Sequence, residues 1–246
     1  MEEAAVRVVI CVPLGTGSCE YRAQNWKIVR QYLETHHPDF PIFLGGSDRE
    51  PFSPAQARND AAKQAGDWDV AVFVDSDTFV HPDCLREAIS VATTENRMVI
   101  AGDGKIYADQ HSSRQYIDTG LFFPAPTDWP DTRRARTEYD PKSVYRDPCS
   151  GVVVVPRPAW EATGGYVDSL SGGDSFEDLV FWGCCEIFGG GMNRTAVVQL
   201  HLWHPVAQRY KGVNYRLYQQ LNKARRHPNA TAMARSLLTP FGHQPP

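Results

Sequence analysis

The first hundred residues alternate between short apolar runs and segments of helical character, and this alternation constrains the fold more than any other feature. Val6–Val12 is a β-branched run, and Arg22–His36 after it carries apolar residues at spacings of three and four. The same order is repeated at Pro41–Leu44, Ala55–Ala65, Val70–Val74 and Pro82–Thr93. Short strands alternating with helices are typical of parallel sheets with right-handed crossovers. The sequence therefore predicts an α/β fold with a Rossmann-like, mainly parallel central sheet flanked by helices.

The rest of the chain has a less regular pattern. Further strands are expected at Met98–Ala101, Leu121–Phe123, Gly151–Val155 and Ala196–Leu202. Helices are expected from Pro158 to Gly164, at Phe176–Phe188, at Val213–Arg226 and, with Asn229 as N-cap, at Ala230–Leu238. The stretch Thr127–Asp147 is rich in Pro, Asp and Arg and predicts an irregular loop. We expect one domain over residues 1–210, in halves of 1–105 and 106–210, and a helical C-terminal appendage over 211–246.

Composition excludes several classes of protein. The 246 residues are 42% hydrophobic and 22% charged, as in ordinary globular proteins, and the formal net charge of −4 gives no general attraction to nucleic acid or anionic membranes. No run approaches the roughly 20 apolar residues of a membrane span, so no membrane insertion is expected. The N-terminal apolar run is interrupted by Arg7 and Pro13, which argues against a secretory signal. The six cysteines lack C-x-x-C spacing, so we expect reduced thiols in the cytoplasm.

Basic residues nevertheless gather at two places in this acidic chain. The first cluster is Arg133, Arg134 and Arg136, in the predicted loop, and the second is Lys223, Arg225, Arg226 and His227. The ordinary interpretation is a solvated loop and a solvated helix face. The alternative is a contact surface for a partner that bears phosphate groups.

The motif Asp75-Ser76-Asp77 directly follows the apolar strand Val70–Val74. Open α/β sheets bind their ligands at the carboxyl ends of their strands, and paired carboxylates suit a hard divalent cation. A second copy, Asp67-Trp68-Asp69, precedes the strand and is expected only to end a helix. The simpler alternative for Asp75 and Asp77 is that they merely end the strand.

The stretch Ser53–Pro82, which reads SPAQARNDAAKQAGDWDVAVFVDSDTFVHP, resembles the nucleotide-sugar half of GT-A glycosyltransferases. In that family an A-R-N helix precedes the strand that bears the D-x-D motif. The resemblance implies that Arg58 and Asn59 face the donor's base or diphosphate, and that Ser76 also contacts the donor. It further implies that Asp75 lies near the ribose and the metal, that Asp77 binds the metal and that Pro13 lines the nucleoside pocket. Without the resemblance, Arg58 is equally well a helix residue in a salt bridge.

A second group of motifs comprises Cys149–Val152, Gly164–Asp168 and Ser175–Asp178. It resembles the segment of galactosyltransferase-like and chondroitin-synthase-like enzymes in which a glycine-rich turn precedes an acidic pair. This resemblance implies that Asp178 is the general base and that Glu177 binds the acceptor. A rival interpretation is a capping box from Ser175 to Asp178 at a helix start. The turn Leu170–Asp174 departs from the family because it lacks a tryptophan, which leaves the acceptor class open.

His201 and His204 follow the late apolar strand. From their spacing alone both are equally well strand-end or surface residues. GT-A enzymes often complete the metal site with a histidine at this place, and His201 is favoured over His204 because it directly follows the apolar run. The resemblance thus implies a divalent cation, Mn²⁺ or Mg²⁺, bound by Asp75, Asp77 and one or both histidines.

Together these features predict a metal-dependent glycosyltransferase of the hexosyltransferase type. We expect it to move a sugar from a nucleotide-sugar donor, by default a UDP-sugar, to a hydroxyl acceptor with inversion. The acceptor is open: hydroxymethylated DNA or another polyanion would suit the basic clusters, and protein or glycan are the alternatives. One rival is a non-catalytic nucleotide- or carbohydrate-binding module. A haloacid-dehalogenase-type phosphatase fits less well, because its motif carries Thr or Val where this chain has Phe79.

Overall fold

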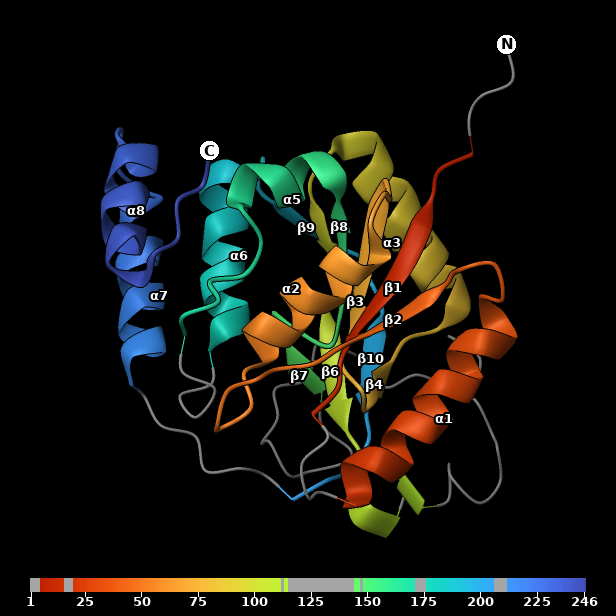
Figure 1. Ribbon diagram of the computed structural model, residues 1–246. Coiled ribbons are helices and arrows are strands. Elements are labelled where there is room, and N and C mark those ends of the chain that lie inside the picture. Colours follow the sequence, from red (N-terminus) through yellow and green to blue (C-terminus); the bar gives the residue numbers. More distant parts are fainter. Residues whose placement is uncertain are drawn as a thin grey trace.

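The computed structural model describes residues 5–15, 20–111, 113–114, 144–146, 148–170, 176–205 and 212–246. Helices cover both faces of a six-stranded central sheet (Figure 1). The strand order is β2(Ile42–Gly45), β1(Val8–Pro13), β3(Val70–Val74), β8(Val152–Pro156), β5(Met98–Ile100) and β9(Met192–Arg194). The predicted α/β class is confirmed, and five of these six strands lie within about two residues of the expected bounds. Strand β9 was not expected.

The central sheet is mainly parallel, as predicted. The pairs β1 with β2, β1 with β3 and β5 with β9 are parallel. Strand β8 is antiparallel to both of its neighbours, β3 and β5. Because β8 runs against β3, its beginning lies beside the end of β3, and this arrangement brings a loop from the second half of the chain to the D-x-D motif.

A second, four-stranded sheet has the order β4, β10, β6 and β7. Its strands are β4(Thr78–Phe79), β10(Val198–His201), β6(Gly104–Tyr107) and β7(Val144–Arg146). Of these, only β10 was expected. The prediction of a loop over Thr127–Asp147 is wrong at Val144–Arg146, and the expected strand Leu121–Phe123 lies outside the described residues. Strands of two to four residues with glycine and charged side chains carry too little apolar periodicity to be recognised.

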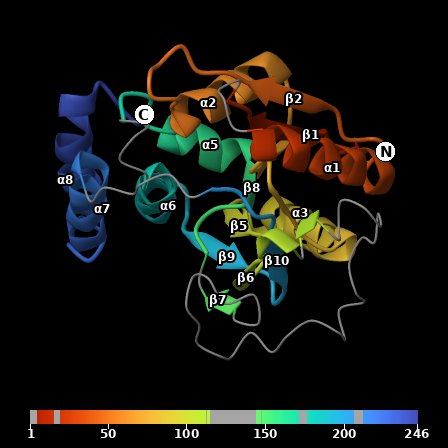
Figure 2. The same ribbon diagram turned by 90° about the horizontal axis from the view of Figure 1, so that it is seen from below.

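Alternating side chains of the central strands face two separate hydrophobic cores. Val8, Ile10 and Val12 of β1 pack with α1(Glu20–His36) and α3(Pro82–Glu95). Val9 and Cys11 face the opposite core with α2(Pro54–Ala65), α5(Arg157–Thr163) and α6(Glu177–Phe188). Figure 2 shows these two groups of helices on opposite sides of the sheet. The strands are therefore buried on both faces, which explains their continuous apolar character.

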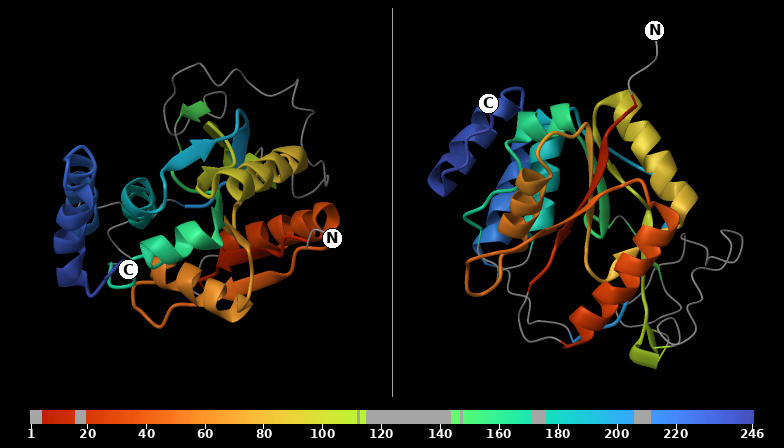
Figure 3. Two further views of the ribbon diagram at one scale, coloured as in Figure 1. Left: turned by 90° about the horizontal axis from the view of Figure 1, so that it is seen from above. Right: turned by 45° about the vertical axis from the view of Figure 1, so that its right-hand side comes forward.

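The C-terminal helices α7(Val213–Ala224) and α8(Ala230–Leu238) pack against α6 through a third core. Figure 3 shows them side by side with α6, away from α1 and α3. Both helices were expected, although Asn229 at the N-cap of α8 makes no side-chain capping bond. The five cysteines in the described ranges are free. Within those ranges no helix is long and apolar enough to cross a membrane.

Helix α2 positions the site, and the sequence predicted where this helix begins and ends. Its N-cap Ser53 accepts a hydrogen bond from the Gln56 backbone, Pro54 occupies the first turn, and Gly66 ends the helix at a φ of 67°. The helix lies directly against β2, where a Cβ added to Gly45 would be 1.7 Å from the carbonyl oxygen of Ala57. The absence of a side chain at Gly45 therefore allows α2 to approach the sheet.

We predict that Gly45→Ala destabilises the protein by about 1–3 kcal/mol, because the methyl group forces α2 away from β2. The neighbouring Gly46→Ala is the matched control, since no atom lies within 4 Å of the added Cβ. Its effect should stay within about 0.5 kcal/mol. Urea unfolding of both variants measures the difference, and equal midpoints would contradict close packing at Gly45.

Candidate metal and active site

The Asp75-Ser76-Asp77 segment is held by backbone bonds from two sides. The amide of Asp75 donates to the carbonyl oxygen of Gly151, at 2.7 Å, just before β8. The carbonyl oxygen of Asp77 accepts from the amide of Leu202, also at 2.7 Å, just after β10. Thr78 then pairs with His201 in the second sheet. The motif therefore lies at the carboxyl edge of the central sheet, where its position in the sequence predicted it.

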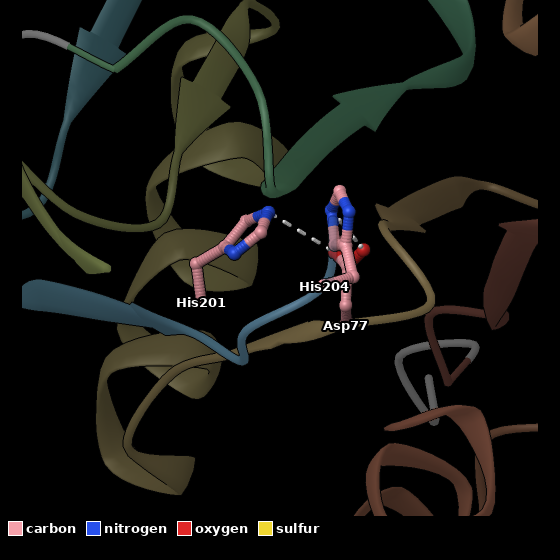
Figure 4. Close-up of side chains that lie close together, drawn as sticks. All are labelled: Asp77, His201 and His204. Carbon is pink, nitrogen blue, oxygen red and sulfur yellow. Dashed lines mark ion pairs between the residues drawn. The ribbon is translucent and has the colours of Figure 1, made fainter. Parts of the chain in front are cut away.

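Asp77, His201 and His204 converge in this place (Figure 4). The His201 Nε2 atom is 3.5 Å from Asp77 Oδ1, and the His204 Nε2 atom is 3.2 Å from Asp77 Oδ2. One ligand atom from each residue lies within 4.8 Å of the others. All three side chains are largely buried. Both histidines, and not His201 alone, therefore take part in the cluster.

The protonation states in this cluster suit a cation. Burial raises the pKa of Asp77, but the nearby His201 and the hydrogen bond from His204 outweigh it and hold this pKa well below its usual range. Burial lowers the pKa of His201 to about 4, although Asp77 opposes the shift. At neutral pH the cluster therefore presents a carboxylate and, at His201, an uncharged imidazole with a lone pair.

A carboxylate oxygen and two imidazole nitrogens that lie this close together form a ligand set for a divalent metal ion. Imidazole binds transition metals more readily than Mg²⁺, which prefers oxygen ligands. Asp75, which we expected to share the metal, is not part of the three-residue cluster. Its carboxylate is held by another residue.

Arg58 joins Asp75 to Glu177 across the site. The Arg58 guanidinium donates to Asp75 Oδ1 at 2.7 Å and to Glu177 Oε1 at 3.0 Å, while its own side chain is only 6% exposed. It also lies over the ring of Tyr166, 5.1 Å from the centroid. The guanidinium thus links α2 of the first half with the start of α6 in the second half. The expected donor contact of Arg58 stays a prediction.

Asn59 binds the turn that follows α5. Its Nδ2 atom donates to the carbonyl oxygen of Tyr166 at 2.8 Å and to the carboxylate of Asp168. Its Oδ1 atom accepts from the Tyr166 amide at 2.9 Å. Both atoms of the amide therefore hold the Gly165–Asp168 segment against α2. A contact between Asn59 and a donor nucleotide stays a prediction, as do those of Pro13, the last residue of β1, and of the buried Ser76.

The acidic pair Glu177 and Asp178 forms the first turn of α6. The N-cap is Phe176, with a φ of 66° and no side-chain capping bond, so the register predicted for a capping box from Ser175 to Asp178 is wrong. Ser175 itself lies outside the described residues. Burial, followed by the charge of Asp178, raises the pKa of Glu177, which Arg58 opposes. The helix dipole stabilises the charged form of both carboxylates at the helix start, and Arg58 stabilises that of Glu177.

Asp178 lies close to the turn before β8. Burial raises the pKa of Cys149 to about 11, and the charge of Asp178 contributes to this shift. The turn that begins at Cys149 leads to Gly151, whose carbonyl oxygen binds the amide of Asp75. The structure therefore brings Asp178 to the same edge of the sheet as the D-x-D motif.

The earlier D-x-D copy has a purely structural position. Asp67 and Asp69 both bind Arg7 at the exposed start of β3. This copy was expected to end a helix, and it does follow the end of α2 at Gly66, with both carboxylates paired with one arginine.

Of the two basic clusters, the second lies within the described residues. Arg133, Arg134 and Arg136 lie outside the described residues. In the second cluster, Arg225 is 3.6 Å from Glu186 and lies over the ring of Trp182, 5.0 Å from its centroid. Arg225 therefore fastens α7 to α6, in contrast to the solvated face that its sequence position indicated.

Sequence reasoning missed one buried cation of the site, Lys105. It lies in β6 and is 2% exposed, and its Nζ atom is 3.4 Å from Ser150 Oγ. A single lysine in a four-residue strand that was not itself recognised gave no usable signal.

No protein-family model matches the chain, and no curated protein matches its sequence. Solved structures do match. Residues 1–349 of S. aureus TarS are 12% identical, with a TM-score of 0.51, over 96% of this chain and 70% of that one. TarS 1–349 in complex with UDP-GlcNAc gives a TM-score of 0.50 at 12% identity, over 96% and 71%. GalNAc-T7 with UDP, GalNAc and Mn²⁺ gives 0.47 at 11% identity, over 99% of this chain and 55% of that one.

The chain has the GT-A fold of nucleotide-sugar glycosyltransferases. This confirms the fold that the stretch Ser53–Pro82 suggested. The chain spans only about half of the GalNAc-T7 structure, at 55% of its length.

We predict that Asp77→Ala abolishes the binding of Mn²⁺, because the variant removes the carboxylate that both histidines face. Asp67→Ala, in the earlier D-x-D copy, should bind the ion as the wild type does. Isothermal titration with Mn²⁺ measures both, and circular dichroism checks that the variants are folded. Unchanged Mn²⁺ affinity in Asp77→Ala would place the metal elsewhere.

Proposed function

We propose that this protein is a metal-dependent glycosyltransferase that transfers a sugar from a nucleoside-diphosphate sugar to a hydroxyl acceptor. The convergence of Asp77, His201 and His204 at the carboxyl edge of a GT-A fold carries this proposal. The S. aureus TarS structure of the same fold binds UDP-GlcNAc, which favours a UDP-sugar as donor. The transferase domain would comprise residues 1–210, with the C-terminal helices as an appendage.

The proposed reaction is a single displacement at the anomeric carbon. Asp178 removes the proton of the acceptor hydroxyl, whose oxygen forms the new glycosidic bond as the bond to the diphosphate breaks. The configuration at the anomeric carbon is then inverted. Arg58 holds Glu177 and Asp75 in place, so that the acidic helix start and the strand end keep a constant distance. Glu177 is proposed to bind the acceptor through its remaining oxygen.

A divalent cation bound by Asp77, His201 and His204 would stabilise the negative charge of the departing nucleoside diphosphate. Of Mn²⁺ and Mg²⁺ we favour Mn²⁺, because two of the three ligands are imidazoles. The chain itself supplies the ionised carboxylate and the buried neutral His201 that such an ion requires.

We predict that Asp178→Asn keeps its affinity for the donor and loses transfer by about 10²–10⁴-fold, the loss typical of a general base. The amide has the size of the carboxylate but cannot take the proton. Glu177→Gln is the variant for comparison. It weakens the ion pair with Arg58 and should therefore also lower the melting temperature. Donor binding by calorimetry and transfer with a labelled donor separate the two effects. Nearly intact turnover in Asp178→Asn would assign the base to another residue.

A non-catalytic nucleotide-binding module is the second candidate, because a GT-A fold can bind a nucleotide without turnover. Donor hydrolysis with and without Mn²⁺ separates the two candidates. An enzyme releases the sugar slowly to water, whereas a binding module leaves the donor intact at saturating Mn²⁺.

The acceptor is proposed to be a polyanion such as hydroxymethylated DNA, with protein or glycan as the alternatives. Lys223 lies in the last turn of α7, and Arg226 follows the helix. The sequence carries a second group of basic residues at Arg133, Arg134 and Arg136. Binding through such cations releases counterions from the polyanion and therefore weakens steeply with salt.

We predict that transfer to hydroxymethylated DNA falls as salt rises and falls further in the triple variant Arg133/Arg134/Arg136→Ala. Labelled donor is offered with hydroxymethylated DNA, unmodified DNA and a protein acceptor at low and moderate salt. Lack of transfer to any DNA would reject the polyanion and leave the glycosyltransferase proposal standing.

A further inference from the structure

The second sheet presents one polar face toward the candidate site. Strands β6 and β10 are parallel, and Gln199 pairs with Lys105 as His201 pairs with Tyr107. Paired residues of neighbouring strands point to the same face, and so do residues two apart in one strand. The intervening Leu200 and Ile106 point the other way, into the core shared with α1 and α3. The metal-ligand candidate His201 and the buried Lys105 therefore share one face of the sheet.

The Lys105 ammonium lies against the turn that precedes β8. Its Nζ atom is 3.4 Å from Ser150 Oγ and 6.0 Å from the centroid of the Tyr107 ring, and the residue is 2% exposed. A Cβ built on Gly151 would lie 2.8 Å from this Nζ atom, so the glycine leaves room for the ammonium. Gly151 also has a φ of +104°, which disfavours any side chain there. The same glycine binds the Asp75 amide, so the ammonium lies close to the D-x-D segment.

Gln199 provides a second, independent sign of a ligand. Its side chain is fully buried, and its Nε2 atom donates to the carbonyl oxygen of Val152 at 3.2 Å. Its Oε1 atom accepts no hydrogen bond from the described residues, and it too faces Gly151, 2.0 Å from a Cβ built there. A buried acceptor without a donor is costly and calls for a partner, such as a ligand hydroxyl or an ordered water. A sugar phosphate has both the hydroxyl groups that such an acceptor binds and the anionic oxygens that an ammonium binds.

A lysine and a divalent cation on one buried face repel each other, because the surroundings screen their charges poorly. An anion placed between them removes this conflict and is attracted by both. A diphosphate has the required charge, and its oxygens suit an ammonium as well as a metal ion.

We propose that Lys105, with Ser150 and Gln199 beside it, is a subsite for the donor phosphates, adjacent to the Asp77, His201 and His204 cluster. The proposal rests on the proposed function, in which this cluster holds a divalent cation and the site binds a nucleoside diphosphate. Its consequence is that Lys105 opposes the binding of the cation alone and supports the binding of cation and diphosphate together.

The test is Lys105→Met, which keeps the length of the side chain and removes its charge. Titration calorimetry measures the binding of Mn²⁺ alone, of UDP with Mn²⁺, and of uridine with Mn²⁺. UDP should bind about 10- to 100-fold more weakly, the loss expected for a hydrogen bond to a charged group. Uridine, which lacks the phosphates, should bind as before, and Mn²⁺ alone should bind equally well or more tightly. Lys105→Arg should keep most of the UDP affinity.

Lys63→Met is the matched control, because Lys63 is exposed in the last turn of α2. It should leave all three affinities unchanged. If Lys105→Met does not fold, Lys105→Gln serves in its place. UDP affinity within about threefold of the wild type would overturn the subsite, and so would a parallel loss of UDP, uridine and Mn²⁺ binding, which indicates a structural role. If the wild type binds neither Mn²⁺ nor UDP, the proposed function itself fails.

Discussion

The buried guanidinium of Arg58 is the contact on which the geometry of the site depends. It binds Asp75 at the end of β3 and Glu177 at the start of α6, at 2.7 and 3.0 Å. These two acidic residues come from different halves of the chain, and their carboxylates would repel each other without the cation between them. Removal of one partner from a buried ion pair typically costs about 3–5 kcal/mol, because the other charge is then left unpaired. Arg58 therefore connects the strand that carries the D-x-D motif to the helix that carries Asp178.

The charged side chains near Arg58 form two neighbouring groups. The Arg58 guanidinium pairs with both Asp75 and Glu177 within the protein. Asp77 instead faces two histidines, at 3.5 and 3.2 Å, in an arrangement that an added cation can complete. The two aspartates of one motif thus have different surroundings, although they are two residues apart. One is held by the fold, and the other is available to a ligand.

Glycines provide the close approaches that this arrangement requires. Gly45 lets α2 lie against β2, and Gly151 leaves space beside β8 for Lys105 and Gln199. In both places a Cβ would come within 2.0 Å of a neighbouring atom. The backbone at these two positions therefore sets how closely α2 and the second sheet surround the D-x-D segment.

The local pattern of the sequence determined the helices, the long apolar strands and the position of Asp75-Ser76-Asp77 at a strand end. These features depend on residues close together in the chain: the periodicity of apolar side chains, the N-cap Ser53 and the terminal Gly66. Histidines were expected near the metal for a different reason, the resemblance to a family. That both His201 and His204 face Asp77 follows from the pairing of β10 with β4, which joins residues more than 120 positions apart. The pairing of Arg58 with Glu177, the antiparallel course of β8 and the burial of Lys105 beside Gly151 were likewise decided only by the tertiary structure. Each depends on which distant segments lie together, and short strands with mixed side chains carry no local signal of their partners.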